Sequence, residues 1–207
     1  MESLFVVVVL IFSVIAHEVA HGYAANALGD PTARLAGRLT LNPLPHIDIV
    51  GSVIIPALLV FSNAGLLFGW AKPVPYNPYN LRDQRYGEAI VAVAGSATNI
   101  LLALVFALIA RVTAGSLPAA ADFASLISFV NLFLGLFNLI PIPPLDGYTV
   151  LRGIAPAALS YRLREFEDRV RGLGAGGIII VLVLFSFLLI GPFYAFVSSI
   201  FSFLVGG

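Results

Sequence analysis

The sequence predicts an all-α polytopic membrane protein with about four to six membrane segments. Hydrophobic residues make up 59% of the 207 residues and charged residues only 11%, whereas soluble domains carry about 25% charged residues. The mean hydropathy is +0.99, and several apolar runs are long enough to cross ~30 Å of hydrocarbon as helices. The 11 basic and 11 acidic residues cancel, so no excess positive charge points to nucleic acid as a partner.

The first apolar run covers residues 4–28 and is interrupted by His17-Glu18-Val19-Ala20-His21. Ionisable groups at membrane depth are costly and usually mark a functional site. The two histidines lie four residues apart, so they project from one helical face, where both can bind one metal ion. Glu18 lies about 100° round the helix from His17, beside the ion. The pattern fits the H-E-x-x-H zinc motif.

The sequence contains no cysteine, which excludes disulfides and leaves His, Asp and Glu as metal ligands. Residues 1–16 have the length of a signal peptide. However, the initial Met1-Glu2-Ser3 lacks the positive charge of a signal peptide's n-region. We therefore expect the first run to be a retained membrane helix.

A polar, turn-rich stretch at residues 30–48 follows, and within it residues 37–42 alternate like a short strand. His46 is interpreted as a loop or interfacial histidine, with a role at the substrate as the alternative. Residues 49–68 are apolar, but their uninterrupted core, residues 53–61, is nine residues long and has a central proline. So short a core favours a re-entrant segment, with a full crossing as the alternative.

The second clear span covers residues 86–111 and contains a patch of small residues at 94–99. Small residues let membrane helices approach closely, and Asn99 in this patch is either an inter-helix hydrogen-bonding group or part of the site. A linker at 112–122 leads to a third span at 123–140.

The third span ends in a proline-rich break, Asn138-Leu139-Ile140-Pro141-Ile142-Pro143-Pro144-Leu145-Asp146-Gly147. Prolines remove backbone donors and disfavour helix in the residue before them, so we expect Asp146 to hang from a broken helix near membrane depth. Irregular backbone there is tolerated only when it is buried in protein or lines a wet cavity. Asp146 is alternatively a simple turn residue, but the chain otherwise lacks a third ligand to join the two histidines.

The last part of the chain predicts a charged helix and at least one further span. Residues 152–171 hold the densest charge and are interpreted as a solvated or interfacial helix. Residues 175–190 predict a fourth span of minimal length. Residues 193–205 are compatible with a return span, an interfacial helix or a kinked continuation.

The distribution of lysine and arginine predicts the orientation in the membrane. If residues 49–68 dip in and return, the spans divide the 11 basic residues 10 to 1, and if they cross, 8 to 3. Because cytoplasmic loops carry the excess of Lys and Arg, the first arrangement is preferred. It places the N-terminus outside and the loops after His21 and Asp146 in the cytoplasm, so the active site is expected toward the cytoplasmic side.

Together these residues match the needs of zinc-dependent hydrolysis. A catalytic zinc takes three protein ligands and keeps one position for water, and His17, His21 and Asp146 supply the three. Zinc lowers the pKa of water toward neutrality, and Glu18 is placed to take the proton and pass it to the leaving amine. Asn138 is a donor that can help to polarise the substrate carbonyl.

The combination resembles the site-2 protease family of intramembrane zinc metalloproteases. The resemblance rests on His17-Glu18-x-x-His21 and on Asn138-x-x-Pro141-x-x-x-Leu145-Asp146-Gly147. Residues 95–99 are similar to the family's G-P-x-x-N, with serine in place of the proline, which weakens only the inference about helix packing. Residues 37–48 and 69–81 are similar to the compact bacterial and archaeal branch.

The resemblance implies one zinc ion per chain and a set of roles: ligands His17, His21 and Asp146, general base Glu18, and stabiliser of the scissile carbonyl Asn138. It also implies that the strand-like residues 37–42 hold an unwound substrate by edge pairing. The substrates it implies are transmembrane segments of membrane proteins, cleaved in regulated intramembrane proteolysis.

We expect one membrane-embedded domain over residues 1–207, in a prokaryotic cell membrane and without PDZ or CBS modules. The catalytic core is expected at about 1–155, the extent of the resemblance, with C-terminal helices at about 156–207. The sequence does not encode the oligomeric state.

Two alternatives come from other functional classes. A divalent-metal transporter also carries His and Asp in its spans. Such transporters more often have repeated halves with paired broken helices, and the sequence shows no such repeat. A non-catalytic membrane binding protein with the same fold is disfavoured by the intact Glu18.

Overall fold

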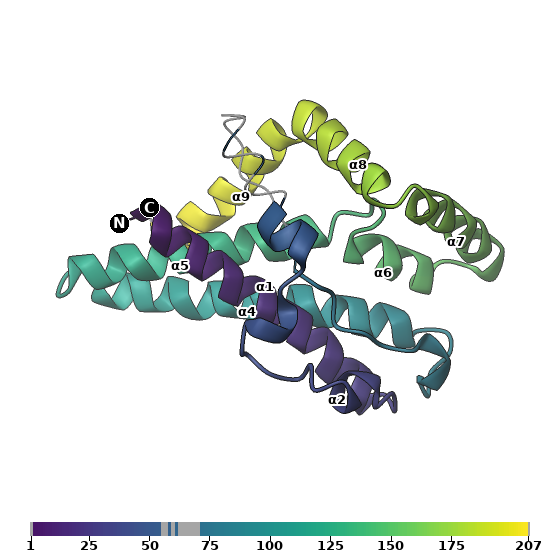
Figure 1. Ribbon diagram of the computed structural model, residues 1–207. Coiled ribbons are helices and arrows are strands. Elements are labelled where there is room, and N and C mark those ends of the chain that lie inside the picture. Colours follow the sequence, from purple (N-terminus) through teal and green to yellow (C-terminus); the bar gives the residue numbers. More distant parts are fainter. Residues whose placement is uncertain (1, 55–57, 59–60, 62–70, 207) are drawn as a thin grey trace.

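The chain forms a helical bundle in the computed structural model (Figure 1), which describes all residues except 1, 55–57, 59–60, 62–70 and 207. No β-strand occurs among the described residues, and three helices are long and apolar enough to cross a membrane. The predicted class, an all-α polytopic membrane protein, is confirmed.

The three long helices are α1 (Glu2–Ala27), α4 (Gly87–Thr113) and α5 (Pro118–Asn138). Helix α4 packs against both of the others, and α4 and α5 form an antiparallel hairpin (Figure 1). The prediction of a linker at 112–122 is wrong in its length, because the observed connection between α4 and α5 consists of residues 114–117. Pro118 is the reason, since proline is favoured in the first turn of a helix, where its missing N–H is not needed.

Small and buried polar side chains hold α4 against α5. Ala103, Ala107 and Ala110 are buried along α4, and the Ser128 hydroxyl donates to the Ala103 carbonyl at 2.8 Å. A Cβ on Gly135 would lie 3.0 Å from the Ser96 carbonyl oxygen, so the two backbones are close. Membrane helices associate through such close packing because lipid offers no hydrophobic gain.

Two shorter helices follow each other at the C-terminal end. Helix α8 (Ala175–Leu188) has 14 residues and α9 (Ile190–Val205) has 16. The expected fourth span at 175–190 is not a single helix of spanning length, because α8 alone reaches only ~21 Å at 1.5 Å per residue. Pro192 lies in the first turn of α9, where it starts a new helix rather than extending α8.

Helix α9 packs on the bundle through aromatic rings. Phe193 meets Phe133 edge to face at 5.1 Å between ring centroids, and Phe201 meets Phe129 at 5.2 Å. Edge-to-face contact is a favoured geometry for aromatic pairs. Val197 is fully buried between these contacts, so α9 covers part of α5 and α4.

A group of loops and short helices covers the C-terminal end of α1. It includes α2 (Thr32–Leu35), η1 (Leu44–His46) and η3 (Pro78–Asn80). Just beyond the end of α1, Gly29 adopts φ 109°, and Asp30 N–H donates to the Ala25 carbonyl at 2.9 Å, as in a Schellman cap.

Asp30, fully buried, connects these loops. Its carboxylate accepts hydrogen bonds from the backbone and hydroxyl of Thr32, from Asn77 N–H at 2.7 Å and from the Asn80 side chain at 2.8 Å. Burial alone would raise the pKa of this carboxyl, but the four hydrogen bonds outweigh burial and lower its pKa. The segment that follows α1 is thereby fixed to the segment that precedes α4.

The expected strand at residues 37–42 is not formed. These residues form turns, bends and irregular backbone, because a strand needs a hydrogen-bonded partner and the described part of the chain supplies none. Residues 49–54 form η2 (Ile49–Ile54), a short π-helix. The expected re-entrant segment at 49–68 falls mainly on 55–57, 59–60 and 62–70, which lie outside the described residues.

Two helices follow the third span. They are α6 (Asp146–Ile154) and the charged α7 (Ala157–Gly172). Arg152 of α6 is buried and pairs with Glu88 of α4 and, at 3.3 Å, with Glu167 of α7. A charge buried in this way is retained only when it is paired, so these contacts fix α6 against α4.

We predict that Asp30→Asn destabilises the protein. Asparagine keeps one acceptor but turns an NH₂ group toward donors, which leaves buried N–H groups unpaired at a cost of about 1–3 kcal/mol. Because the folded-state pKa lies below the unfolded value of 3.8, the stabilisation is complete above that pH and is lost as the pH falls through the folded-state pKa. Thermal unfolding in detergent measures the loss.

The matched control is Asp122→Asn, which alters an exposed carboxylate on α5. Its unfolding temperature should equal that of the wild type. An Asp30→Asn variant as stable as this control would show that the carboxylate does not hold the loops.

Candidate metal centre

Helix α1 brings His17 and His21 to the face that meets α4. The two rings lie one turn apart with centroids separated by 4.5 Å, and His17 is only 5% exposed. The helix forms here because the flanking run is apolar and free of proline. Gly95 of α4 makes the approach possible, since a Cβ there would lie 2.5 Å from His21 Cε1 and 2.8 Å from His17 Cε1.

Asp146 comes from the break that follows α5. The prolines end α5 at Asn138, and Asp146 becomes the first residue of α6. Gly147 permits the tight return, because a Cβ on it would lie 2.1 Å from the Leu139 carbonyl oxygen. Asp146, 125 residues after His21 in the sequence, is thereby brought to the face of α1 that carries the histidines.

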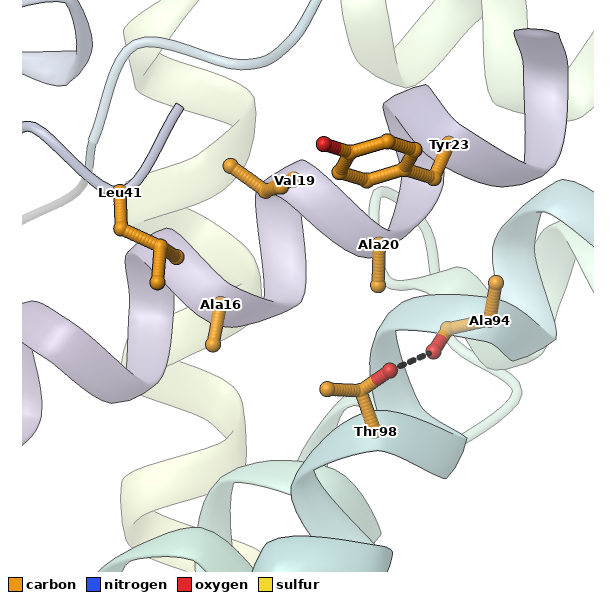
Figure 2. Close-up of a pocket in the computed structure, with 7 residues that line it drawn as sticks. All are labelled: Ala16, Val19, Ala20, Tyr23, Leu41, Ala94 and Thr98. Carbon is orange, nitrogen blue, oxygen red and sulfur yellow. Dashed lines mark hydrogen bonds between the residues drawn. The ribbon is translucent and has the colours of Figure 1, made fainter. Parts of the chain in front are cut away.

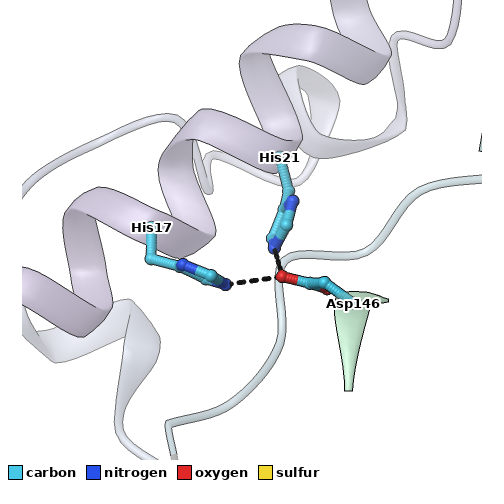
Figure 3. Close-up of side chains that lie close together, drawn as sticks. All are labelled: His17, His21 and Asp146. Carbon is cyan, nitrogen blue, oxygen red and sulfur yellow. Dashed lines mark ion pairs between the residues drawn. The ribbon is translucent and has the colours of Figure 1, made fainter. Parts of the chain in front are cut away.

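Three candidate ligand atoms converge (Figure 3). Asp146 Oδ2 lies 3.0 Å from His17 Nε2 and 3.3 Å from His21 Nε2, and all three atoms lie within 4.8 Å of one another. Ligands ~2.0–2.1 Å from a tetrahedral zinc stand ~3.3 Å apart, so these separations match two edges of a zinc site.

The outer nitrogens of both histidines are occupied. His17 Nδ1 lies 2.6 Å from Asn99 Oδ1, and His21 Nδ1 lies 2.7 Å from the Val91 carbonyl oxygen. An oxygen acceptor requires a proton on Nδ1, which leaves the Nε2 lone pair of a neutral ring directed at Asp146. Metal-bound histidines are held in this way by partners behind them.

The inward-facing atoms fit a cation. Asp146 Oδ2 is buried and has no hydrogen-bond partner among the described residues. Two lone pairs and a carboxylate oxygen facing one point repel one another unless a cation lies between them. The donor set of two imidazoles and one carboxylate is one that zinc accepts.

Glu18 follows His17 on α1. Its Oε2 accepts a hydrogen bond of 2.8 Å from the backbone N–H of Val74. Val74 is buried against α1, and a Cβ on Gly22 would lie 2.8 Å from it. The extended segment before α4 therefore holds the Glu18 carboxylate on the side of α1 that faces the loops.

The other sequence-predicted residues divide into two groups. Asn99 is buried, and its Oδ1 contacts the outer nitrogen of His17 rather than the three converging atoms. Asn138 and His46 are not brought to the three ligand atoms. The Asn138 amide donates to Leu134 of its own helix at 3.0 Å, and buried His46 Nε2 bonds the Thr40 carbonyl at 2.9 Å, as a loop histidine does.

Sequence reasoning missed two partners of the site. The Val91 carbonyl is backbone, and no residue type marks it. Asn131 bonds to Asn99, and its only sequence signal is a polar side chain in an apolar span, two helical turns before Asn138. Such residues in membrane helices mark inter-helix bonds or sites.

A hollow of about 420 Å³ lies between α1 and α4 beside the histidines (Figure 2). Its lining is mainly apolar, and the polar side-chain groups are the hydroxyls of Tyr23 and Thr98. The Thr98 hydroxyl already donates to the Ala94 carbonyl at 2.9 Å. Ala16 and Ala20, which line it, are the chain neighbours of His17 and His21. The hollow thus offers apolar space next to the face of α1 that carries the two histidines.

Comparison with known proteins gives the following matches. A family model described as Peptidase family M50 matches residues 117–185, which contain Asp146. YwhC of Bacillus subtilis, named as a candidate zinc metalloprotease, is 38% identical over 189 residues, covering 87% of this chain and 80% of YwhC.

Two mycobacterial proteins named in the same way also match. Rip2 of Mycolicibacterium smegmatis is 33% identical over 160 residues, covering 71% of this chain and 59% of Rip2. Rip3 of Mycobacterium tuberculosis is 32% identical over 182 residues, covering 86% of this chain but 36% of Rip3. The chain therefore spans less than two thirds of Rip2 and of Rip3. No solved structure matches it.

We predict that Asp146→Ala removes most bound zinc. The variant loses one of three ligands and the only ionised one, whereas the wild type should bind about one zinc per chain. Metal analysis of protein purified in detergent measures the ratio. Asp168→Ala, which removes an exposed carboxylate from α7, is the control and should keep its zinc. Equal zinc in both variants would exclude Asp146 as a ligand.

Proposed function

Because the chain belongs to peptidase family M50, the family of the site-2 proteases, we propose that it is a zinc-dependent intramembrane endopeptidase. Its proposed substrates are transmembrane segments of membrane proteins. The observation that carries the proposal is the convergence of His17 Nε2 and His21 Nε2, on a helix long enough to span a membrane, with Asp146 Oδ2.

The proposed reaction is hydrolysis of a peptide bond. Zinc, when bound by His17, His21 and Asp146, supplies a Lewis acid that polarises the carbonyl and acidifies water. Glu18 accepts a proton from water as the hydroxyl adds to the carbonyl carbon. Glu18 then delivers the proton to the amide nitrogen as the C–N bond breaks.

The surroundings support these roles. The Val74 N–H fixes the Glu18 carboxylate in one orientation, which favours rapid proton transfer. We propose that Asn138 stabilises the carbonyl oxygen once its amide turns from Leu134 toward the substrate. In this proposal residues 1–155 form the catalytic core and the C-terminal helices support it.

We propose that the active site faces the cytoplasm and that the N-terminus lies outside. Arg111, at the end of α4, is then the basic residue on the outer side. At the other end of the bundle lie Lys72, in the loop before α4, and Arg152, in α6, as the positive-inside rule expects. The integral membrane location itself agrees with the three long apolar helices.

We predict that Glu18→Gln abolishes cleavage while zinc stays bound. Glutamine keeps an oxygen to accept the Val74 N–H but cannot take a proton, so the rate should fall about 10²–10⁴-fold. Cleavage of a reporter transmembrane segment in detergent or vesicles gives the rate, and metal analysis gives the zinc content. Glu165→Gln, at an exposed position of α7, is the control. Undiminished cleavage by Glu18→Gln would refute the proposed mechanism.

A further inference from the structure

We propose that Asn131 is a positioning residue of the metal site. Acting through the Asn99 amide, it holds His17 in the form that leaves Nε2 free to bind a cation. This inference rests on the proposed function in one respect, that it takes His17 as a metal ligand. Asn131 lies in α5 and is 1% exposed, one side chain away from His17.

A chain of hydrogen bonds connects the three long helices. Asn131 Nδ2 donates to the Ile127 carbonyl of its own helix at 2.9 Å. Asn99 Nδ2 donates to Asn131 Oδ1 at 2.9 Å and to the Ser13 carbonyl of α1 at 3.1 Å. Asn99 Oδ1 then faces His17 Nδ1 at 2.6 Å.

The direction of this chain is determined by its ends. A backbone carbonyl only accepts, so the carbonyl of Ile127 requires the NH₂ group of Asn131 and turns Asn131 Oδ1 toward Asn99. That oxygen and the Ser13 carbonyl both require donors, and the two N–H bonds of Asn99 satisfy them. Only the Asn99 oxygen is left for His17, so the proton resides on Nδ1 and the lone pair on Nε2.

A flipped Asn99 amide would be penalised at two points. Its oxygen would face two acceptors, Asn131 Oδ1 and the Ser13 carbonyl, and its NH₂ group would face the ring nitrogen of His17. Asn99 is 0% exposed, so bulk solvent does not reach the amide to relieve such contacts. Asn131 therefore removes an alternative in which His17 Nδ1, not Nε2, carries the lone pair.

The two histidines differ in this respect. His21 bonds directly to the Val91 carbonyl, which cannot flip. His17 depends on two side-chain amides, either of which can be replaced by mutation. Loss of Asn131 should accordingly act on the metal site through His17 alone.

The test is a double-mutant cycle on zinc affinity, measured by competition with a chromophoric chelator on the full chain in detergent. Asn99→Leu should weaken zinc binding about 10–100-fold and Asn131→Leu about tenfold, the range for partners behind a ligand. Since Asn131 acts through Asn99, the double variant should be no weaker than Asn99→Leu. Additive losses would overturn the proposal.

The matched control is Ser128→Ala, one turn earlier on the same face of α5. Ser128 is also buried and donates to α4, at the Ala103 carbonyl, but has no link to His17. It should lower the unfolding temperature and leave zinc affinity unchanged. If Ser128→Ala weakens zinc binding as much as Asn131→Leu does, the effect is general loosening of α4 and α5, and the proposal fails.

A second measurement guards against misfolding of the leucine variant. Asn131→Ala adds no volume to the helix interface and should show the same tenfold loss of zinc affinity. The chain has only three histidines, so ¹⁵N shifts of labelled zinc-free protein report the tautomer of each ring. The Nδ1–H form of His17 should decline in Asn131→Ala while that of His21 persists, and an unchanged His17 tautomer would overturn the inference.

If zinc binding does not depend on Asp146, a different claim fails. That result would refute the proposed metal site itself, whereas zinc binding that needs Asp146 but ignores Asn131 would refute only the positioning role.

Discussion

Polar groups buried between membrane helices have no water to bind, and the architecture of this protein depends on that constraint. The histidines of α1 face α4, and every nitrogen on their outer side meets an oxygen from Val91 or Asn99. The same need pairs Arg152 with Glu88 and Glu167. The bonds that satisfy buried groups are thus also the bonds that position the proposed metal-binding atoms.

The helices could be predicted from the sequence because apolar runs report directly on membrane spans. Proline and glycine likewise located the break that presents Asp146, since backbone chemistry is local. The association of His17, His21 and Asp146 was accessible for a different reason, namely that so few residues in an apolar chain can bind zinc. The match to the model of peptidase family M50 agrees with that reasoning, and it covers the part of the chain that contains Asp146.

Features that depend on spatial neighbours could not be predicted. The alternation at residues 37–42 suggested a strand, but alternation says nothing about whether a pairing partner exists. Pro118 begins α5 earlier than hydropathy indicated, because hydropathy does not detect helix starts. The contacts of Asp30 with Asn77 and Asn80 join segments far apart in sequence, and no local pattern encodes them.

The close approach of Gly95 to both imidazoles gives the histidines a second physical role. The rings occupy the space that a side chain on α4 would otherwise take, so they pack the interface as well as being proposed ligands. An alanine at either histidine therefore opens a void between α1 and α4 in addition to removing a donor atom. Activity lost in such a variant mixes two causes, and replacements of similar volume, such as glutamine, separate coordination from packing.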